Sequence, residues 1–108
     1  MGAVMINSHS GHDSWDINTA ISYFEQTLQI EHDLIQNNEK YKNILVVHET
    51  HRQRLMYSPY QTRDILAHKS TKNLKINADL SHWVCVCEHV FESSSDRDDW
   101  WPVLLNNI

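Results

Sequence analysis

The 108-residue sequence has too little positive charge, glycine and cysteine for several familiar classes of protein. Nine Lys and Arg against 14 Asp and Glu give a net charge of −5, which disfavours binding to a nucleic-acid backbone. Its only glycines, Gly2 and Gly11, cannot form a glycine-rich phosphate loop. Cys85 and Cys87 are too few and too close together for a disulfide framework, which fits a reducing compartment. We expect both to be small buried side chains rather than zinc ligands.

Long hydrophobic runs are also missing. The longest, residues 44–47, 83–87 and 100–105, are far shorter than the roughly 18 residues that span a bilayer. The first residues contain no basic leader followed by an apolar stretch. These features predict a cytoplasmic protein without a membrane segment. A hydrophobic content of 41% is enough for one modest domain, and we place it over residues 1–108.

Hydrophobic periodicity predicts strands that alternate with helices. The strands are expected at residues 3–6, 44–47 and 74–78. Helices are expected from a cap at Asp13 or Ser14 to residues 37–38, from Ser58-Pro59 to about residue 69, over 83–91, and from residue 98 to 104. Residues 83–86 would also suit a strand.

The three strand starts are separated by distances typical of the units of a (β/α)8 barrel, in which about 250 residues form eight units. This rhythm predicts an α/β fold with three parallel strands and flanking helices. Because three units cannot close a barrel, the chain is expected to be either a small open sheet or part of a larger TIM barrel.

Histidines and acidic residues gather just after the predicted strands. They are His9, His12, His48, His51, His82, Glu49 and Asp79. In parallel α/β folds the carboxyl ends of the strands are the edge where active sites form. The remaining histidines, His32, His68 and His89, fall in predicted helices, where we expect them to be solvated or partly buried.

Glu49 and Asp79 each have two explanations. Glu49 follows an apolar strand, where a carboxylate is costly unless it binds a cation or pairs with a base. Metal ligation and an ion pair with Arg52 or Arg54 explain it equally well. Asp79 and His82 form an Asp-x-x-His pattern, which can bring a carboxylate and an imidazole to one metal ion. The alternative is that Asp79 caps the helix that contains His82.

Three segments together resemble the xylose isomerase-like TIM-barrel superfamily, the sugar (phosphate) isomerase and epimerase group. They are NSHSGHD at residues 7–13, HETHR at 48–52 and DLSHW at 79–83. The resemblance covers nearly the whole chain. It implies that the chain holds the third, fourth and fifth βα units of the barrel and is a fragment of a longer protein.

The same resemblance implies roles for five residues. Glu49 and Asp79 would be two of four ligands to a divalent metal ion, Mn²⁺, Mg²⁺ or Zn²⁺. His82 would contact substrate or metal, His9 would lie in the substrate-binding loop of the third strand, and Arg52 would hold a substrate oxygen or phosphate. The family's ligand His on the sixth strand and Glu on the eighth have no counterparts here, so half of the metal shell is missing.

The implied reaction is aldose-ketose isomerisation or epimerisation of a small sugar or sugar phosphate. Glu49 would bind the metal and transfer a proton next to the carbonyl group. Because the metal shell is incomplete, we expect the 108-residue chain to be inactive by itself.

Two other functions fit parts of the sequence. The apurinic endonuclease branch of the same superfamily shares a third-strand His, a fourth-strand Glu and the Asp-x-x-His pattern, but the net charge of −5 disfavours DNA. A non-catalytic fragment or interaction module is the alternative from another class. It would self-associate through open sheet edges or pair with the missing part of the barrel.

Overall fold

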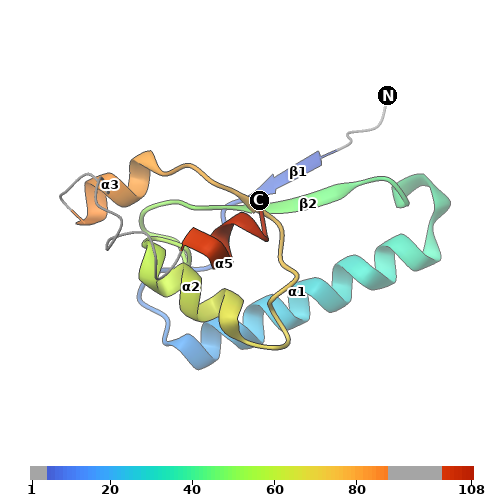
Figure 1. Ribbon diagram of the computed structural model, residues 1–108. Helices are drawn as coiled ribbons and strands as arrows, with labels where there is room; N and C mark the ends of the chain where they lie inside the picture. Colours follow the sequence, from blue (N-terminus) through green and yellow to red (C-terminus); the bar gives the residue numbers. More distant parts are fainter. Residues whose placement is uncertain (1–4, 88–100) are drawn as a thin grey trace.

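The computed structural model describes residues 5–87 and 101–108, which form a parallel sheet flanked by helices (Figure 1). The strands are β1 (Met5–Ser8), β2 (Leu45–Glu49) and β3 (Ile76–Asn77), hydrogen-bonded in the order β1-β2-β3. The helices in this part of the chain are α1 (Ile17–Asn37), α2 (Pro59–Ala67), α3 (Ser81–Cys87) and α5 (Trp101–Leu105), with a short 3-10 helix, η1 (Glu39–Tyr41). The prediction of an α/β fold with three parallel strands is confirmed.

The strands lie where the hydrophobic pattern predicts them, with different bounds. β2 continues beyond the predicted residues 44–47 and ends at Glu49. β3 has two residues instead of the predicted 74–78, because the backbone N–H of Asp79 donates to the carbonyl of Asn77 and turns the chain away. β3 is therefore the shortest of the three strands.

The register of the strands decides which side chains share a face, because successive residues of a strand point to opposite sides. Asn7 lies opposite Val47, and Glu49 lies opposite Asn77, so these four residues share one face. The other face carries Ile6, Ser8, Val46, His48 and Ile76. Helix α1 covers this second face, where the ring of Phe24 meets the ring of His48 edge-on at 5.1 Å, and it runs beneath β1 and β2 in Figure 1.

The face that carries Asn7 is less covered. The unbroken apolar run at residues 44–47 is typical of a strand that is buried on both faces. This prediction is wrong at Leu45, which is 41% exposed. The reason is that α1 lies against the opposite face only. At the outer edge of β3, the backbone N–H of Ile76 donates to the carbonyl of Asn107 at 2.8 Å. Among the described residues, the free edge of the sheet is therefore that of β1.

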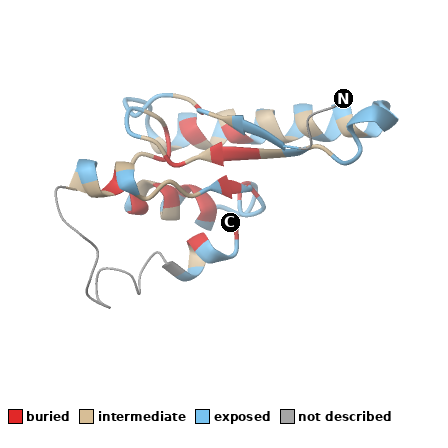
Figure 2. Ribbon diagram, turned by 90° about the horizontal axis from the view of Figure 1, so that it is seen from above, coloured by how far each residue is buried: buried red, intermediate tan, exposed pale blue. Residues whose placement is uncertain are grey.

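The core lies between the sheet and the helices. Its buried members are Ala20, Phe24, Leu55, Met56, Ile65, Leu66, Leu74, Ile76, Trp83 and Leu104. Figure 2 shows buried residues on β2, α1 and α2, whereas the end of α1 beside η1 is mostly exposed. The indole N–H of Trp83 donates to the carbonyl of Met56 at 3.0 Å, so α3 is fixed to the loop that follows β2.

Capping side chains set the starts of the two longer helices. Asp16, rather than the predicted Asp13 or Ser14, caps α1 by accepting from the backbone N–H of Thr19 at 2.7 Å. Ser58 caps α2 with Pro59 in the first turn, as predicted.

None of the helices within residues 5–87 and 101–108 is both long and apolar enough to span a bilayer.

Residues 81–87 are helical, so the strand alternative for 83–86 is wrong. Trp83 is the buried anchor of α3, and Cys85 lies two residues, or about 200°, farther around the helix. Cys85 is therefore exposed and Cys87 is partly exposed, which contradicts the prediction that both are buried. The predicted helical residues 88–91 and 98–100 lie outside the described part, as does His89.

Gly11 allows the loop after β1 to pack against the loop after β2. Its φ is +65°, a left-handed conformation that glycine adopts without strain. The backbone N–H of Leu55 donates to the carbonyl of Ser10 at 3.0 Å, and the Leu55 side chain fills the space where a Cβ on Gly11 would lie. This contact brings together the loops that carry His9 and His51.

We expect Gly11→Ala to lower the free energy of unfolding by roughly 2–4 kcal/mol, because it adds backbone strain and displaces Leu55. Urea unfolding followed by circular dichroism measures the loss. Gln53→Gly is the matched control, because Gln53 is exposed and already has a φ of 66°, so glycine there should cost little. A Gly11→Ala chain as stable as the original would contradict this account.

Candidate metal centre

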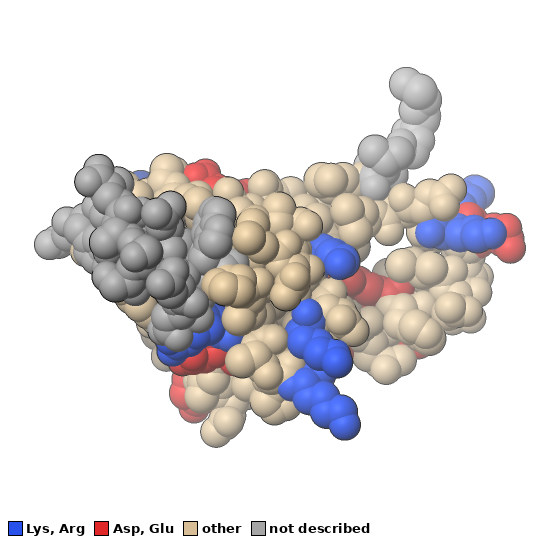
Figure 3. All heavy atoms as spheres, in the orientation of Figure 1, with Lys and Arg blue, Asp and Glu red and all other residues tan. Residues whose placement is uncertain are grey.

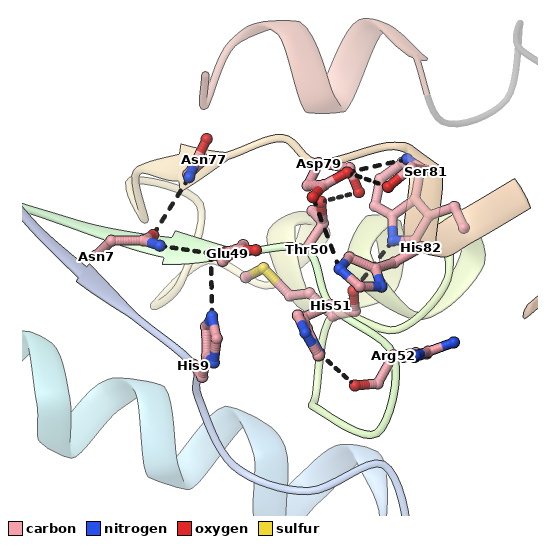
Figure 4. A network of polar contacts seen from close by, with 12 residues as sticks. Asn7, His9, Glu49, Thr50, His51, Arg52, Asn77, Asp79, Ser81 and His82 are labelled. Atoms are coloured by element: carbon pink, nitrogen blue, oxygen red, sulfur yellow. Dashed lines mark hydrogen bonds and ion pairs between the residues drawn. The ribbon is translucent and has the colours of Figure 1, made fainter. Parts of the chain in front are cut away.

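The carboxyl ends of the strands bring several predicted site residues together (Figure 4). Glu49 is the last residue of β2, and Asp79 and His82 follow β3. His9 follows β1, in the loop that Gly11 and Leu55 hold in place. The sheet edge therefore gathers Glu49, Asp79, His82 and His9 as predicted.

Glu49 is held by two neighbours from the β1 side. Asn7 Nδ2 donates to Glu49 Oε2 at 2.5 Å, and His9 Nε2 lies 3.0 Å from the same oxygen. Asn77 Nδ2 donates to Asn7 Oδ1 at 3.4 Å, so the contacts extend across all three strands. The hydrogen bond from Asn7, aided by His9, lowers the pKa of Glu49 and outweighs the effect of burial.

The alternative of an ion pair between Glu49 and an arginine does not fit this arrangement. Within the described residues Glu49 lies 3.0 Å from His9 Nε2 and forms no ion pair with Arg52 or Arg54. Arg54 instead donates from Nη1 to the carbonyl of Gly11 at 3.3 Å. Arg52 is exposed on the loop after β2, where its side chain is available to solvent.

Asp79 caps the start of α3, the second of the two explanations that the sequence offers, and it also faces His82. Its Oδ1 accepts from the backbone N–H of Ser81 at 3.1 Å and from the Ser81 hydroxyl at 2.5 Å, at the start of α3. Its Oδ2 lies 3.6 Å from His82 Nε2. The hydrogen bonds from Ser81 lower the pKa of Asp79, with a smaller contribution from His82. Thr50 Oγ1 donates to the carbonyl of Asp79 at 2.9 Å and ties this loop to the end of β2.

His51 lies at this edge, as predicted, although the resemblance gives it no role. Its ring lies between those of His9 and His82, with centroids 4.7 and 3.9 Å away. Its Nδ1 is 2.6 Å from the carbonyl of Arg52, which can only accept, so Nδ1 carries the hydrogen. In the neutral ring this tautomer leaves the Nε2 lone pair for a ligand, the arrangement typical of a metal-binding histidine.

Two overlapping groups of side chains have the spacing of metal ligands. The ligand atoms of His9, Glu49 and His51 lie within 4.8 Å of one another, and so do those of Glu49, Asp79 and His82. Imidazole nitrogen with carboxylate oxygen suits Zn²⁺ and Mn²⁺. The lowered pKa values of Glu49 and Asp79 favour the ionised forms that bind a cation. The residues present therefore fit a divalent metal, and Glu49 belongs to both groups.

Two histidines predicted near this edge lie elsewhere. His48 precedes Glu49 in β2 and so points to the opposite face, where it is buried against α1. His12 is exposed and lies 3.0 Å from Asp13 in the loop after β1. His32 and His68 are exposed, as predicted.

Asn7 is a site residue that the sequence does not predict, and His51 is one that the sequence places at this edge without a ligand role. Asn7 interrupts an apolar strand and lies on the same face as Glu49, so a polar residue inside a predicted strand is the feature that could have indicated it. His51 is two residues beyond Glu49, a spacing that places side chains on the same side of an extended chain.

Comparison with known proteins adds no relative. No family model, no curated protein and no solved structure matches this chain. The relation to the xylose isomerase-like superfamily therefore stays a prediction from the sequence.

We expect Asn7→Leu to raise the pKa of Glu49, because it removes the hydrogen bond that contributes most to lowering it. Carbon NMR of the glutamate carboxyl groups, recorded against pH in a metal-free chain, measures this directly. Asn77→Leu is the control, since it removes only the longer bond to Asn7 and leaves the bond to Glu49. Equal pKa values for Glu49 in the Asn7→Leu chain and the original would show that Asn7 does not set it.

Proposed function

We propose that this chain carries part of the divalent-metal site of a sugar or sugar-phosphate isomerase or epimerase, built on a xylose isomerase-like TIM barrel. The observation that carries the proposal is the convergence of Glu49, Asp79 and His82 at the ends of neighbouring parallel strands. These are the positions at which the sequence resemblance assigns two metal ligands and a substrate or metal contact.

The arrangement of the sheet supports the barrel part of the proposal. The strands are parallel, and a helix follows each of β1, β2 and β3 along the chain. Helix α1 covers one face, while Asn7, Glu49 and Asn77 share the other. In a barrel, this second face would be the interior, from which catalytic side chains reach the carboxyl-terminal mouth.

A bound divalent ion would supply Lewis-acid polarisation of two adjacent sugar oxygens, which acidifies the neighbouring C–H group. Glu49 and Asp79 would hold the ion, and Glu49 would also take up and return the proton next to the carbonyl. Asn7 and His9 orient the Glu49 carboxylate and keep it ionised, as both roles require. His82 offers a hydrogen bond to a sugar oxygen.

Arg52 gives the proposed site a means of recognising a phosphorylated sugar. Its guanidinium group is exposed on the loop between β2 and α2, which begins at the edge where Glu49 lies. A planar guanidinium can bind two phosphate oxygens at once, so Arg52 suits the phosphate of a sugar phosphate.

We expect the folded chain to bind Zn²⁺ or Co²⁺, with Glu49→Gln causing the largest loss because Glu49 belongs to both ligand groups. The loss should exceed the roughly 10–100-fold that is typical when a residue that only orients a metal ligand is replaced, and His82→Ala should weaken binding less. Isothermal titration calorimetry and the visible absorption of bound Co²⁺ measure affinity and geometry.

Asp33→Asn is the matched control for this titration. Asp33 also lies beside a histidine, at 3.6 Å from His32, but both are exposed on α1 away from the sheet edge. Circular dichroism checks that each variant is folded. The metal site is wrong if Asp33→Asn weakens binding as much as Glu49→Gln, or if the folded chain binds neither ion.

We expect the 108-residue chain with Mn²⁺ to leave ketoses and their phosphates unchanged, because the resemblance assigns two further ligands to strands without counterparts here. Proton NMR in D₂O detects isomerisation or exchange of the hydrogen next to the carbonyl. Metal-dependent turnover by the purified chain would contradict this expectation. Sequencing the coding DNA on both sides of the frame then shows whether strands ending in His and Glu follow, and a longer protein that has them should catalyse the exchange.

A further inference from the structure

An apolar cavity of about 350 Å³ opens between α1 and the strands β1 and β2. Its walls are formed by Ile6, Leu34, Ile35, Tyr41, Ile44 and Val46. Figure 3 shows the hollow between the strands and the second half of α1, with acidic atoms at its inner end. This volume is at the lower end of the range for small-molecule sites in proteins.

The walls of the cavity leave apolar surface in contact with water. Ile6 is 47% exposed, Leu34 is 54% exposed and Tyr41 is 41% exposed. Covering such surface is favourable in proportion to the area removed from water. The cavity would therefore bind the hydrocarbon part of a ligand.

Of the described residues that line the cavity, Glu31 alone is charged. Its side chain is 21% exposed, and its Oε1 is buried without a hydrogen-bond partner. Burial raises the pKa of Glu31, as expected for a carboxylate whose charge is poorly compensated. A cation that entered the cavity would meet this carboxylate.

His48 does not supply the missing positive charge. Its Nε2 lies 3.5 Å from Glu31 Oε1 and, like that oxygen, has no hydrogen-bond partner. Burial lowers the pKa of His48 to about 4, so the ring is neutral at pH 7. Its Nδ1 is already engaged at 2.6 Å by the hydroxyl of Ser10. The described residues that line the cavity include no Lys or Arg. The carboxylate of Glu31 therefore attracts a cation that these residues do not provide.

We propose that this cavity binds a small amphipathic amine, with its hydrocarbon part against Ile6, Leu34 and Val46 and its ammonium group on the carboxylate of Glu31. The carboxylate selects for positive charge, and the apolar walls exclude strongly hydrated cations such as simple metal ions. An ammonium N–H donating to a carboxylate is a charge-assisted hydrogen bond, the stronger kind.

The cavity is separate from the candidate metal centre. Ile6 and Val46 lie opposite each other on the face that α1 covers, whereas Glu49 is on the other face, at the carboxyl end of β2. The amine site therefore goes beyond the proposed function and does not depend on it.

The test compares n-hexylammonium, n-hexanol and n-hexanoate at pH 7.5 by NMR of the methyl groups of the 108-residue chain. We expect saturable shifts at the methyls of Ile6, Leu34 and Val46, with hexylammonium binding about tenfold more tightly than hexanol, as one charge-assisted hydrogen bond provides. Hexanoate should bind most weakly, because its carboxylate is repelled by Glu31.

Glu31→Gln keeps the shape of the side chain and should remove the preference for hexylammonium while leaving hexanol binding unchanged. Glu39→Gln is the matched control, since Glu39 is exposed in η1 and does not line the cavity, and it should keep the preference. Equal affinities for the three probes in the original chain, or shifts confined to other methyls, would overturn the proposal. This comparison decides the matter even if Glu31→Gln does not fold.

Discussion

The parallel pairing of β1 with β2, in a register that sets Asn7 opposite Val47, is the constraint on which the other features of this protein depend. Because side chains alternate along a strand, this register places Asn7 on the face of Glu49 and leaves Ser8 with His48 on the other. A slip of one residue would take Asn7 away from the Glu49 carboxylate. The polar contacts at the sheet edge and the packing of α1 thus depend on one alignment.

The neighbours His48 and Glu49 illustrate how strongly the two faces differ. The pKa of His48 is lowered because burial against α1 opposes the charged ring. The pKa of Glu49 is lowered because Asn7 and His9 stabilise the charged carboxylate. One residue is therefore kept neutral and the next is kept ionised, although they are joined by a single peptide bond. The sheet separates a carboxylate suited to cations from an imidazole that is part of the packed interior.

The sequence predicts the elements and the acidic residues at the sheet edge better than it predicts their partners. Strong local patterns, such as the apolar run before Glu49 and the Ser58-Pro59 helix start, fix the order of strands and helices. The face on which His48 lies depends on alternation along β2, and the exposure of Cys85 depends on its position around α3. The contact of Asn7 with Glu49 depends on the register between two strands that are distant in sequence. The cavity beside Glu31 arises from how α1 meets the strands, which no local pattern encodes.

Asp79 serves two neighbours with its two oxygens. One oxygen accepts both hydrogen bonds from Ser81 at the first turn of α3, and the other faces the ring of His82. One carboxylate therefore takes part both in the start of α3 and in the cluster of side chains at the sheet edge. A serine or threonine there could also begin the helix, but its single oxygen could not occupy both of the positions that the two Asp79 oxygens take. Two terminal oxygens therefore let the side chain of residue 79 meet Ser81 and His82 without any change in the loop.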